Sequence, residues 1–347
     1  MRTSMQYPYK RIAIKVGSNV LARKDGTLDV TRMSALVDQI AELHKAGVEV
    51  ILISSGAVAS GRSEIKPSKK LDSVDQRQLF SAVGQAKLIN RYFELFRDHG
   101  ISVGQVLTMK ENFSTRRLYL NQRNCMMVML ENGVIPIVNE NDTVSVTELM
   151  FTDNDELSGM IASMMDMQAL FILSNIDGIY NGSPTAAGSQ VIREVEPGKD
   201  LSDYIQTEKS GFGRGGMLTK TTIARKVADE GIAVYIANGK KDNILIDLMQ
   251  HPDTTVCTRF VPAKEDVSSV KKWIAHSDGF AKGRLLLNEQ AVKVLKGRKA
   301  VSLLPVGVTS IEGEFEKDDI VRIIDHKGKQ VGVGRVAFDS TEAVTMI

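Results

Sequence analysis

A chain of 347 residues with 43% hydrophobic and 25% charged residues has the composition of a globular protein with a large buried core, and its length favours two domains over one. Its formal net charge of +2 provides no general field that would attract nucleic acid or an anionic membrane surface. Two distant cysteines, five scattered histidines and the lack of a long apolar run argue against disulfides, a zinc site, a secretion signal and a membrane span, so we expect a cytoplasmic protein without membrane attachment.

Residues 11–261 alternate between short apolar runs and longer amphipathic patterns. The short runs are typical of buried strands, whereas the longer patterns repeat their apolar residues at helical spacing. This alternation predicts a mostly parallel sheet with helices on both faces. The segment 181–211 is polar and rich in glycine, so we expect a hairpin or lid there. The expected strands lie at 12–16, 48–53, 101–107, 134–138, 169–173 and 233–237, and the expected helices at 31–45, 74–97, 116–131, 217–229 and from Asp155 onward.

The pattern changes near residue 262. Residues 262–270 are polar and charged, as in a linker, and the signals after Trp273 become short and β-like with glycines between them. We therefore expect a large α/β domain over residues 8–262 and a small β-rich domain over residues 271–347. Within the small domain the expected strands are 285–287, 302–304, 320–324 and 332–337, with one helix at 289–295.

The stretch 134–162 places two polar clusters beside apolar elements. Residues 139–142 (Asn-Glu-Asn-Asp) follow a buried strand, and residues 153–155 (Asp-Asn-Asp) open a helical pattern. Since ligands bind beyond the carboxyl ends of the strands in an open α/β sheet, both clusters would line that crevice. Turn formation or helix capping accounts for one such residue, but several carboxylates held together repel unless cations or donors share the space. We therefore expect lysines, a metal ion or an amine ligand beside them.

Three stretches supply positive charge and free backbone amides. Lys15 lies near the end of the first expected strand, just before Gly17. The small residues 54–61 follow the second expected strand, and a tight turn is an equally good interpretation of them. Residues 211–220 hold four glycines ahead of Lys220. This loop is neither a dinucleotide fingerprint, because no strand precedes it, nor a P-loop. Lysines, carboxylates and glycine amides together favour phosphoryl transfer, in which the protein positions the reactants and neutralises charge.

Five sequence blocks, taken in order, resemble the amino acid kinase family over essentially the whole chain. They are KVGSN at 15–19, SSGAVASG at 54–61, VNEND at 138–142, TDNDELS at 152–158 and GRGGMLTK at 213–220, and the tail after Trp273 resembles a PUA domain. The resemblance implies a three-layer α/β/α sandwich with a mostly parallel sheet, plus a small β-rich PUA-like domain. It is closest to members that use ATP and Mg²⁺ to phosphorylate the side-chain carboxylate of L-glutamate. The implied product is L-glutamyl 5-phosphate, in the first step of proline biosynthesis.

The resemblance also implies roles for individual residues. Lys15 and Lys220 would stabilise the transferring phosphoryl group, and Asp155 would hold these lysines in orientation. Asp142 would take the α-ammonium group of glutamate. The other implied contacts are Ser55, Asn139 and Asn154 for glutamate, and Lys15, Gly17, Ser174, Asn175, Arg214, Gly215, Gly216, Met217, Leu218, Thr219 and Lys220 for ATP, with no residue assigned to a metal ion.

Three positions depart from the family pattern. Ser174-Asn175 stands where Thr or Ser followed by Asp is usual, residues 181–184 replace a Thr-x-Asp-Pro-like turn, and Arg214 replaces a small polar residue. These departures bear on nucleotide binding rather than on the reaction. The chain ends at Ile347, which we expect to lie before the closing segment of the PUA domain.

The resemblance further implies feedback inhibition by proline, a homo-oligomer (dimer or tetramer) and hand-off of the product to glutamyl phosphate reductase. Two other functions stay open. One is a related kinase acting on aspartate or N-acetylglutamate, although an ammonium-binding Asp142 disfavours an N-acylated substrate. The other is an RNA-binding or regulatory protein, because PUA domains elsewhere bind RNA. Residues 271–347 hold thirteen Lys and Arg against ten Asp and Glu, and this net +3 is too weak to argue for RNA by itself.

Overall fold

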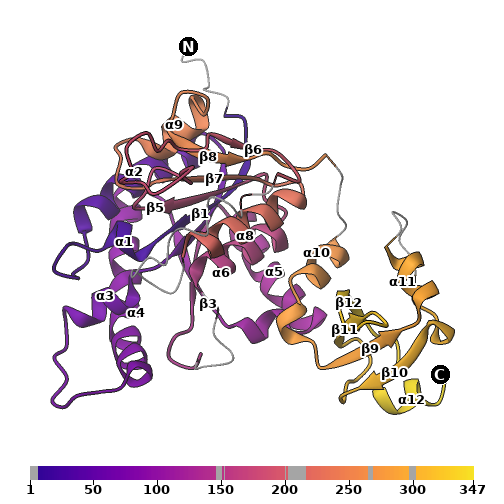
Figure 1. The fold of residues 1–347 in the computed structure, drawn as a ribbon. Helices are drawn as coiled ribbons and strands as arrows, with labels where there is room; N and C mark the ends of the chain where they lie inside the picture. Colours follow the sequence, from indigo (N-terminus) through magenta and orange to yellow (C-terminus); the bar gives the residue numbers. More distant parts are fainter. Residues whose placement is uncertain are drawn as a thin grey trace. The chain divides into compact units, whose positions relative to one another are not determined.

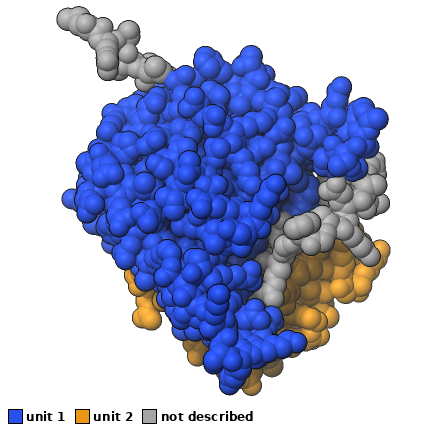
Figure 2. Space-filling view, turned by 90° about the vertical axis from the view of Figure 1, so that its left-hand side faces the viewer, with its two compact units in different colours: residues 1–110, 123–266 blue, residues 111–122, 267–347 orange. Residues whose placement is uncertain are grey.

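The computed structural model describes residues 7–145, 151, 153–199, 201, 216–264, 269–296 and 302–347. The chain forms two compact units, which Figure 2 colours separately. Unit 1 comprises residues 1–110 and 123–266, and unit 2 comprises residues 111–122 and 267–347. Unit 2 therefore takes a short segment from the middle of the sequence as well as the C-terminal part.

Unit 1 is built on a sheet of eight strands. They are β1 (Arg11–Val16), β2 (Glu49–Ser54), β3 (Val103–Thr108), β4 (Ile135–Glu140), β5 (Ala169–Ser174), β6 (Glu194–Val195), β7 (Ala233–Asn238) and β8 (Cys257–Phe260). Their order is β3-β4-β2-β1-β5-β7-β8-β6, and neighbours are parallel except that β8 runs antiparallel to β7. The central strands are buried almost throughout, which is why the sequence shows continuous apolar runs there rather than alternation. The predicted mostly parallel α/β sheet is confirmed.

Helices cover both faces of this sheet and complete three layers (Figure 1). One face carries α2 (Val30–Lys45), α4 (Ser73–Asp98) and α9 (Ile244–Gln250). The other carries α6 (Asn154–Met164), α8 (Met217–Asp229) and the second half of α5 (Arg116–Glu131). Two short helices, α1 (Ser18–Leu21) and α3 (Ala57–Arg62), follow β1 and β2 directly.

Aspartate side chains set where three of these helices begin. Asp29, Asp72 and Asp153 accept hydrogen bonds from backbone N–H groups in the first turns of α2, α4 and α6. Such caps satisfy amides that have no partner inside the helix. The sequence analysis expected helix capping within residues 153–155, and Asp153 is the residue that does it.

Unit 2 contains a separate sheet of four strands with the order β10-β9-β11-β12. The pair β9–β11 is parallel and the other two pairs are antiparallel. The strands are β9 (Gly283–Leu287), β10 (Val308–Glu312), β11 (Ile320–Ile324) and β12 (Gln330–Arg335), and the helices are α10 (Ser269–Ala275), α11 (Glu289–Leu295) and α12 (Ser340–Val344). The predicted small β-rich domain is confirmed by this sheet.

One expected strand is wrong. Residues 302–304 have no strand conformation, and a short 3-10 helix begins at Pro305, whose ring lacks the N–H that a sheet ladder needs. The strand of this region is β10, a few residues later. The expected hairpin or lid at 181–211 is described only in part, where Tyr180 bridges Val191 in antiparallel fashion and β6 follows.

Candidate active site

The predicted site residues of unit 1 gather at the carboxyl ends of its central strands. Lys15 is on β1, Ser55 follows β2, Asn139 is on β4 and Ser174 ends β5. Because parallel strands end at one edge of a sheet, residues distant in sequence meet there. They line a cavity of about 620 Å³ together with Gly17, Asp142, Asn154, Asp155 and Lys220.

Two lysines in the cavity pair with a single carboxylate. Lys15 Nζ lies 2.6 Å from Asp155 Oδ1, and Lys220 Nζ lies 2.8 Å from Asp155 Oδ2. All three side chains are buried, and Asp155 is wholly inaccessible. Burial opposes ionisation of Asp155, but the two ammonium groups outweigh it and hold its pKa below the usual range. The structure thus brings the three predicted catalytic residues together with a net charge of +1.

Asp153 lies beside this group; the sequence analysis placed it in the polar cluster 153–155 that would line the crevice but gave it no individual role in the reaction. Its Oδ1 accepts the backbone N–H groups of Asp155 and Glu156 at 2.9 and 3.0 Å. Its Oδ2 is buried with no hydrogen-bond partner among the described residues. Burial, followed by the charge of Asp155, raises the pKa of Asp153. A buried oxygen of this kind fits a cation or donor brought by a ligand.

Amide and hydroxyl groups form a hydrogen-bonded chain at the cavity wall. Asn154 Nδ2 donates to Ser55 Oγ at 2.7 Å and to Asn139 Oδ1 at 3.2 Å. Asn139 Nδ2 in turn donates to Gln85 Oε1 on α4 at 2.9 Å. Ser55, Asn139 and Asn154, which were predicted to bind glutamate, are therefore held in one network.

A second charged group in the cavity has two carboxylates paired with a single guanidinium. Arg77 Nη2 donates to Glu140 Oε2 at 2.8 Å and to Asp142 Oδ1 at 2.5 Å, and Arg77 Nε donates to the same Asp142 oxygen at 2.8 Å. Burial raises the pKa of Glu140 to about 6; the charge of Asp142 acts in the same direction, whereas the N–H of Phe151 and the charge of Arg77 oppose it. This group of three carries a net charge of −1 when both carboxylates are ionised.

The residues predicted to bind ATP are brought together only in part. Gly17 approaches β5 closely: its N–H donates to Leu173 O at 3.1 Å, and an added Cβ would lie 3.3 Å from that oxygen. Ser174 lines the cavity, whereas Asn175 is exposed and does not. Gly216 caps the N-terminus of α8, and Met217, Leu218 and Thr219 form its first turn without lining the cavity. Arg214 and Gly215 lie outside the described residues.

Three functional candidates on α4 escaped the sequence analysis. Arg77, Ser81 and Gln85 are spaced four residues apart, so they share one face of the helix, and each bonds a residue of the segment 139–142. The sequence does show three polar residues at this spacing within an amphipathic helix, and this pattern could have marked them as site residues. A helix face that is simply exposed to solvent shows the same pattern, and only the position of β4 beside α4 distinguishes the two.

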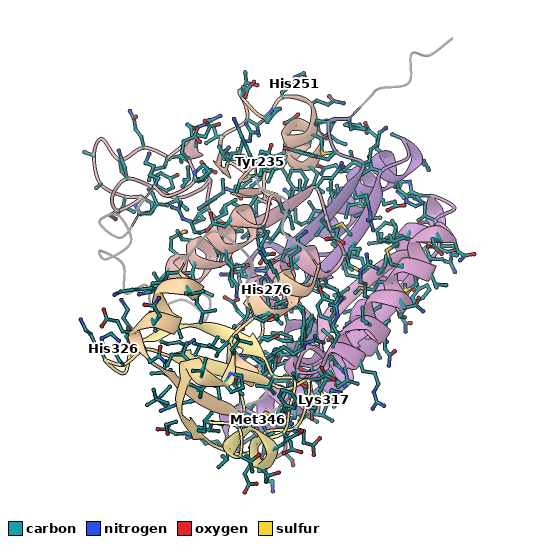
Figure 3. All side chains as sticks on the ribbon, turned by 90° about the vertical axis from the view of Figure 1, so that its right-hand side faces the viewer. Tyr235, His251, His276, Lys317, His326 and Met346 are labelled. Atoms are coloured by element: carbon teal, nitrogen blue, oxygen red, sulfur yellow. The ribbon has the colours of Figure 1, made fainter. Side chains whose placement is uncertain are left out.

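No histidine is among the described residues that line the cavity. His251 follows α9, and His276 and His326 belong to unit 2 (Figure 3). The described residues also contain no group of three or more His, Cys, Asp or Glu side chains that would hold a metal ion. The chemistry of the cavity thus rests on lysine, arginine, carboxylate and amide groups. Within the same described ranges, no helix has the length and apolar composition needed to cross a membrane.

Comparison with known proteins identifies the family. Residues 10–238 match the model of the amino acid kinase family, and residues 283–347 match that of the PUA domain. The chain is 78% identical to the glutamate 5-kinase of Bacteroides thetaiotaomicron, over 98% of this chain and 94% of that protein. It is 46% identical to the glutamate 5-kinase of Chlorobaculum tepidum, again over 98% and 94%.

A UMP kinase from Bacillus anthracis shares the fold, with a TM-score of 0.50 and 16% identity over 73% of this chain and 96% of that one. The resemblance read from the five sequence blocks is confirmed by these matches. The chain belongs to the amino acid kinase family, together with these glutamate 5-kinases, and carries a PUA domain.

Proposed function

We propose that the chain transfers the γ-phosphoryl group of ATP to the side-chain carboxylate of L-glutamate, giving L-glutamyl 5-phosphate and ADP. The observation that carries the proposal is that two groups of opposite net charge line one cavity. The group Lys15–Asp155–Lys220 has a net charge of +1, and the group Arg77–Glu140–Asp142 has a net charge of −1. Glutamate matches this polarity, because its ammonium and its side-chain carboxylate stand at opposite ends. The names of the relatives support the same substrate.

In the proposed reaction an oxygen of the glutamate side-chain carboxylate attacks the γ-phosphorus of ATP. A new P–O bond forms, the bond from the γ-phosphorus to the bridging oxygen breaks, and ADP leaves with that electron pair. The attacking carboxylate is already ionised at neutral pH, so the step needs no general base. This suits a cavity whose described lining lacks histidine.

The chain's part in this step is to orient the reactants and stabilise charge. Lys15 and Lys220 would face the oxygens of the moving phosphoryl group, where negative charge concentrates in the transition state. Asp155 holds both ammonium groups in place, with N–O distances of 2.6 and 2.8 Å. Such preorganisation is effective because nothing must reorient as the charge moves.

We also propose that Mg²⁺ accompanies ATP. The ion would take most of its ligands from the phosphates and water, as is usual when Mg²⁺ serves a nucleotide, and its charge would offset that of the phosphates. Among the residues that the structure describes, the buried Asp153 Oδ2 has no hydrogen-bond partner and would fit such an ion.

Several partner proposals rest on the family alone. They are feedback inhibition by proline, a dimeric or tetrameric assembly, and hand-off of the product to glutamyl phosphate reductase. RNA binding by the PUA domain stays a prediction as well. A cytoplasmic location is proposed because ATP is supplied there, and the free thiols of Cys125 and Cys257 suit that reducing compartment.

The proposed function is tested by incubating the protein with ATP, Mg²⁺ and L-glutamate in the presence of hydroxylamine. The expected result is ADP release that depends on glutamate, together with glutamyl hydroxamate, because hydroxylamine traps an acyl phosphate. Aspartate and N-acetyl-L-glutamate are tested alongside. Hydroxamate from either of these in place of glutamate would refute the substrate assignment, and a folded protein that releases no ADP with any of them would refute the reaction.

A further inference from the structure

The negatively charged group in the cavity repeats the pattern of the catalytic group with the charges reversed. Where Asp155 sits between two lysines, Arg77 sits between Glu140 and Asp142. Arg77 Nη2 donates to both carboxylates and Nε donates to Asp142 as well, with distances of 2.5 to 2.8 Å. The two carboxylates are 4% and 9% exposed. Such burial makes their mutual repulsion strong unless a cation lies between them.

Arg77 is also held in place by the helix that carries it. The backbones of α3 and α4 pack so closely that an added Cβ on Gly84 would lie 1.8 Å from Ala57 O, and one on Gly61 would lie 1.9 Å from Phe80 O. Ser81 Oγ on the same face of α4 donates to Asp142 Oδ2 at 3.3 Å. The guanidinium therefore belongs to a rigid element that supports the carboxylates from one side.

We propose that Arg77 is a positioning and specificity residue for the amino group of the substrate: it keeps the Arg77–Glu140–Asp142 group at a net charge of −1, which one substrate ammonium neutralises. The inference rests on the proposed function and assigns a role to a residue outside the predicted set. The net charge of −1 counts these three residues, which all belong to the part of the chain that the structure describes.

The charge count makes distinct predictions for two neutral substitutions. Arg77→Gln leaves both carboxylates without their shared cation, so they repel, and Asp142 loses the donors that orient it. Glu140→Gln leaves Arg77 paired with Asp142 at net zero, so the attraction for an ammonium is lost. In the double variant Arg77→Gln/Glu140→Gln, Asp142 alone restores −1. A residue with a purely structural role would instead make the double variant at least as impaired as the worse single variant.

The experiment measures kcat and KM for L-glutamate and for glutarate, which lacks the amino group, at pH 8. There Glu140 is ionised in the wild-type protein, because its pKa is about 6. Each single variant is expected to raise the KM for glutamate on the order of tenfold, the scale of one lost charged hydrogen bond, with the KM for ATP unchanged. The double variant is expected to have a lower glutamate KM than either single variant. Glu140→Gln is also expected to narrow the preference for glutamate over glutarate, and the double variant to widen it again.

Two sets of controls separate charge from disruption. Arg91 and Glu94 form an exposed pair on the same helix, with N–O 2.7 Å, so Arg91→Gln, Glu94→Gln and their double variant are expected to leave all constants unchanged. Arg77→Lys keeps the charge, so it is expected to retain the preference for glutamate over glutarate even if the KM rises. Thermal unfolding shows whether each variant is folded. If Arg77→Gln does not fold, the glutamate-over-glutarate preference of Arg77→Lys decides the test.

The outcomes distinguish this inference from the proposed function. A wild-type protein that turns over glutamate, with a double variant no better than the worse single variant, overturns the role of Arg77 and leaves the proposed function intact. An Arg77→Lys protein that loses the preference over glutarate does the same. A wild-type protein that turns over no glutamate overturns both.

Discussion

At the scale of single residues, Lys220 gives the most direct test of the proposed chemistry. Lys220→Ala removes one of two ammonium groups from Asp155, 2.8 Å away, and is expected to lower kcat on the order of 10² to 10³, the usual loss for one preorganised charge stabiliser. Lys226 is on the same helix but does not line the cavity, so Lys226→Ala is the matched control with unchanged kcat. Steady-state kinetics decide the matter: an unchanged kcat with a raised KM for ATP would make Lys220 a binding residue only.

Asp142 tests the amine end of the site independently. Asp142→Asn keeps the size of the side chain but removes the charge that would meet the substrate ammonium, so the KM for glutamate is expected to rise on the order of tenfold or more while that for ATP stays constant. Asp75, exposed in the first turn of α4, provides the control Asp75→Asn. A change confined to the KM for ATP would contradict the amine-site assignment.

Glu140 links the site to stability through its protonation. Its folded-state pKa of about 6 lies above the ordinary value of 4.5, so between these values the native state holds a proton that the unfolded chain has lost. The contribution of Glu140 to the free energy of unfolding therefore falls as the pH rises through this window. Glu140→Gln removes this pH-dependent contribution. As the pH rises through the window, the unfolding free energy of the wild-type protein should therefore fall relative to that of the variant. Urea unfolding at several pH values across the window measures the difference in unfolding free energy between wild type and variant, and Glu94→Gln, at an exposed position, is the control. A difference that does not change with pH would refute the prediction.

The resemblance implied the pairing of Asp155 with Lys15 and Lys220, whereas the pairing of Arg77 with Glu140 and Asp142 was not predicted. Lys15, Asp155 and Lys220 were predicted together because the blocks that contain them match a family, and their mutual distances come only from the fold. Arg77 was missed for a physical reason. An arginine on an amphipathic helix is usually solvated, and only the position of β4 relative to α4 brings Glu140 and Asp142 to it.

At the scale of elements, the packing of α3 against α4 fixes the position of Arg77. Gly84 is inside α4, where alanine would ordinarily favour the helix by about 1 kcal/mol. Here the added Cβ would lie 1.8 Å from Ala57 O, so Gly84→Ala is expected to destabilise unit 1 by roughly 1–3 kcal/mol or more and to raise the KM for glutamate. Gly332→Ala in β12, where a Cβ meets nothing within 4 Å, is the control. Chemical denaturation with kinetics measures both effects, and a stabilised Gly84→Ala protein would show that the helices are not in this contact.

Elements with a clear hydrophobic pattern were predicted well, whereas two short segments, 302–304 and α3, were not. The helices at 116–131, 217–229 and 289–295 and the strand at 320–324 match the bounds of α5, α8, α11 and β11. The expected strand at 302–304 failed because the pair Leu303-Leu304 before a proline resembles a short strand in sequence. α3 was not predicted because it is six residues long and contains a glycine, so no helical period is visible; the close approach to α4 explains that glycine.

At the scale of the whole molecule, the chain crosses from one unit to the other and back. Residues 111–122 fold with unit 2, although the sequence places them in the middle of the kinase-like region. Periodicity identifies the helix at 116–131 but carries no information about which core each half of it joins. Such a discontinuous unit could not be predicted from composition or pattern, because the contact that defines it joins residues 160 positions apart.

That contact centres on Trp273, the only tryptophan of the chain. Its Nε1 donates to Phe113 O at 2.9 Å, the guanidinium of Arg116 lies 5.9 Å from its ring, and Phe113 itself is buried. Phe113→Ala is therefore expected to destabilise unit 2 by about 3–5 kcal/mol, the usual cost of emptying a buried aromatic site. Tryptophan emission during urea unfolding reports on Trp273 alone, so the midpoint of that transition should fall. Phe338, which is 40% exposed in the same unit, supplies the control Phe338→Ala with a much smaller shift. An unshifted midpoint for Phe113→Ala would mean that residues 111–122 do not contribute to the core of unit 2, and that the PUA domain folds from the C-terminal segment alone.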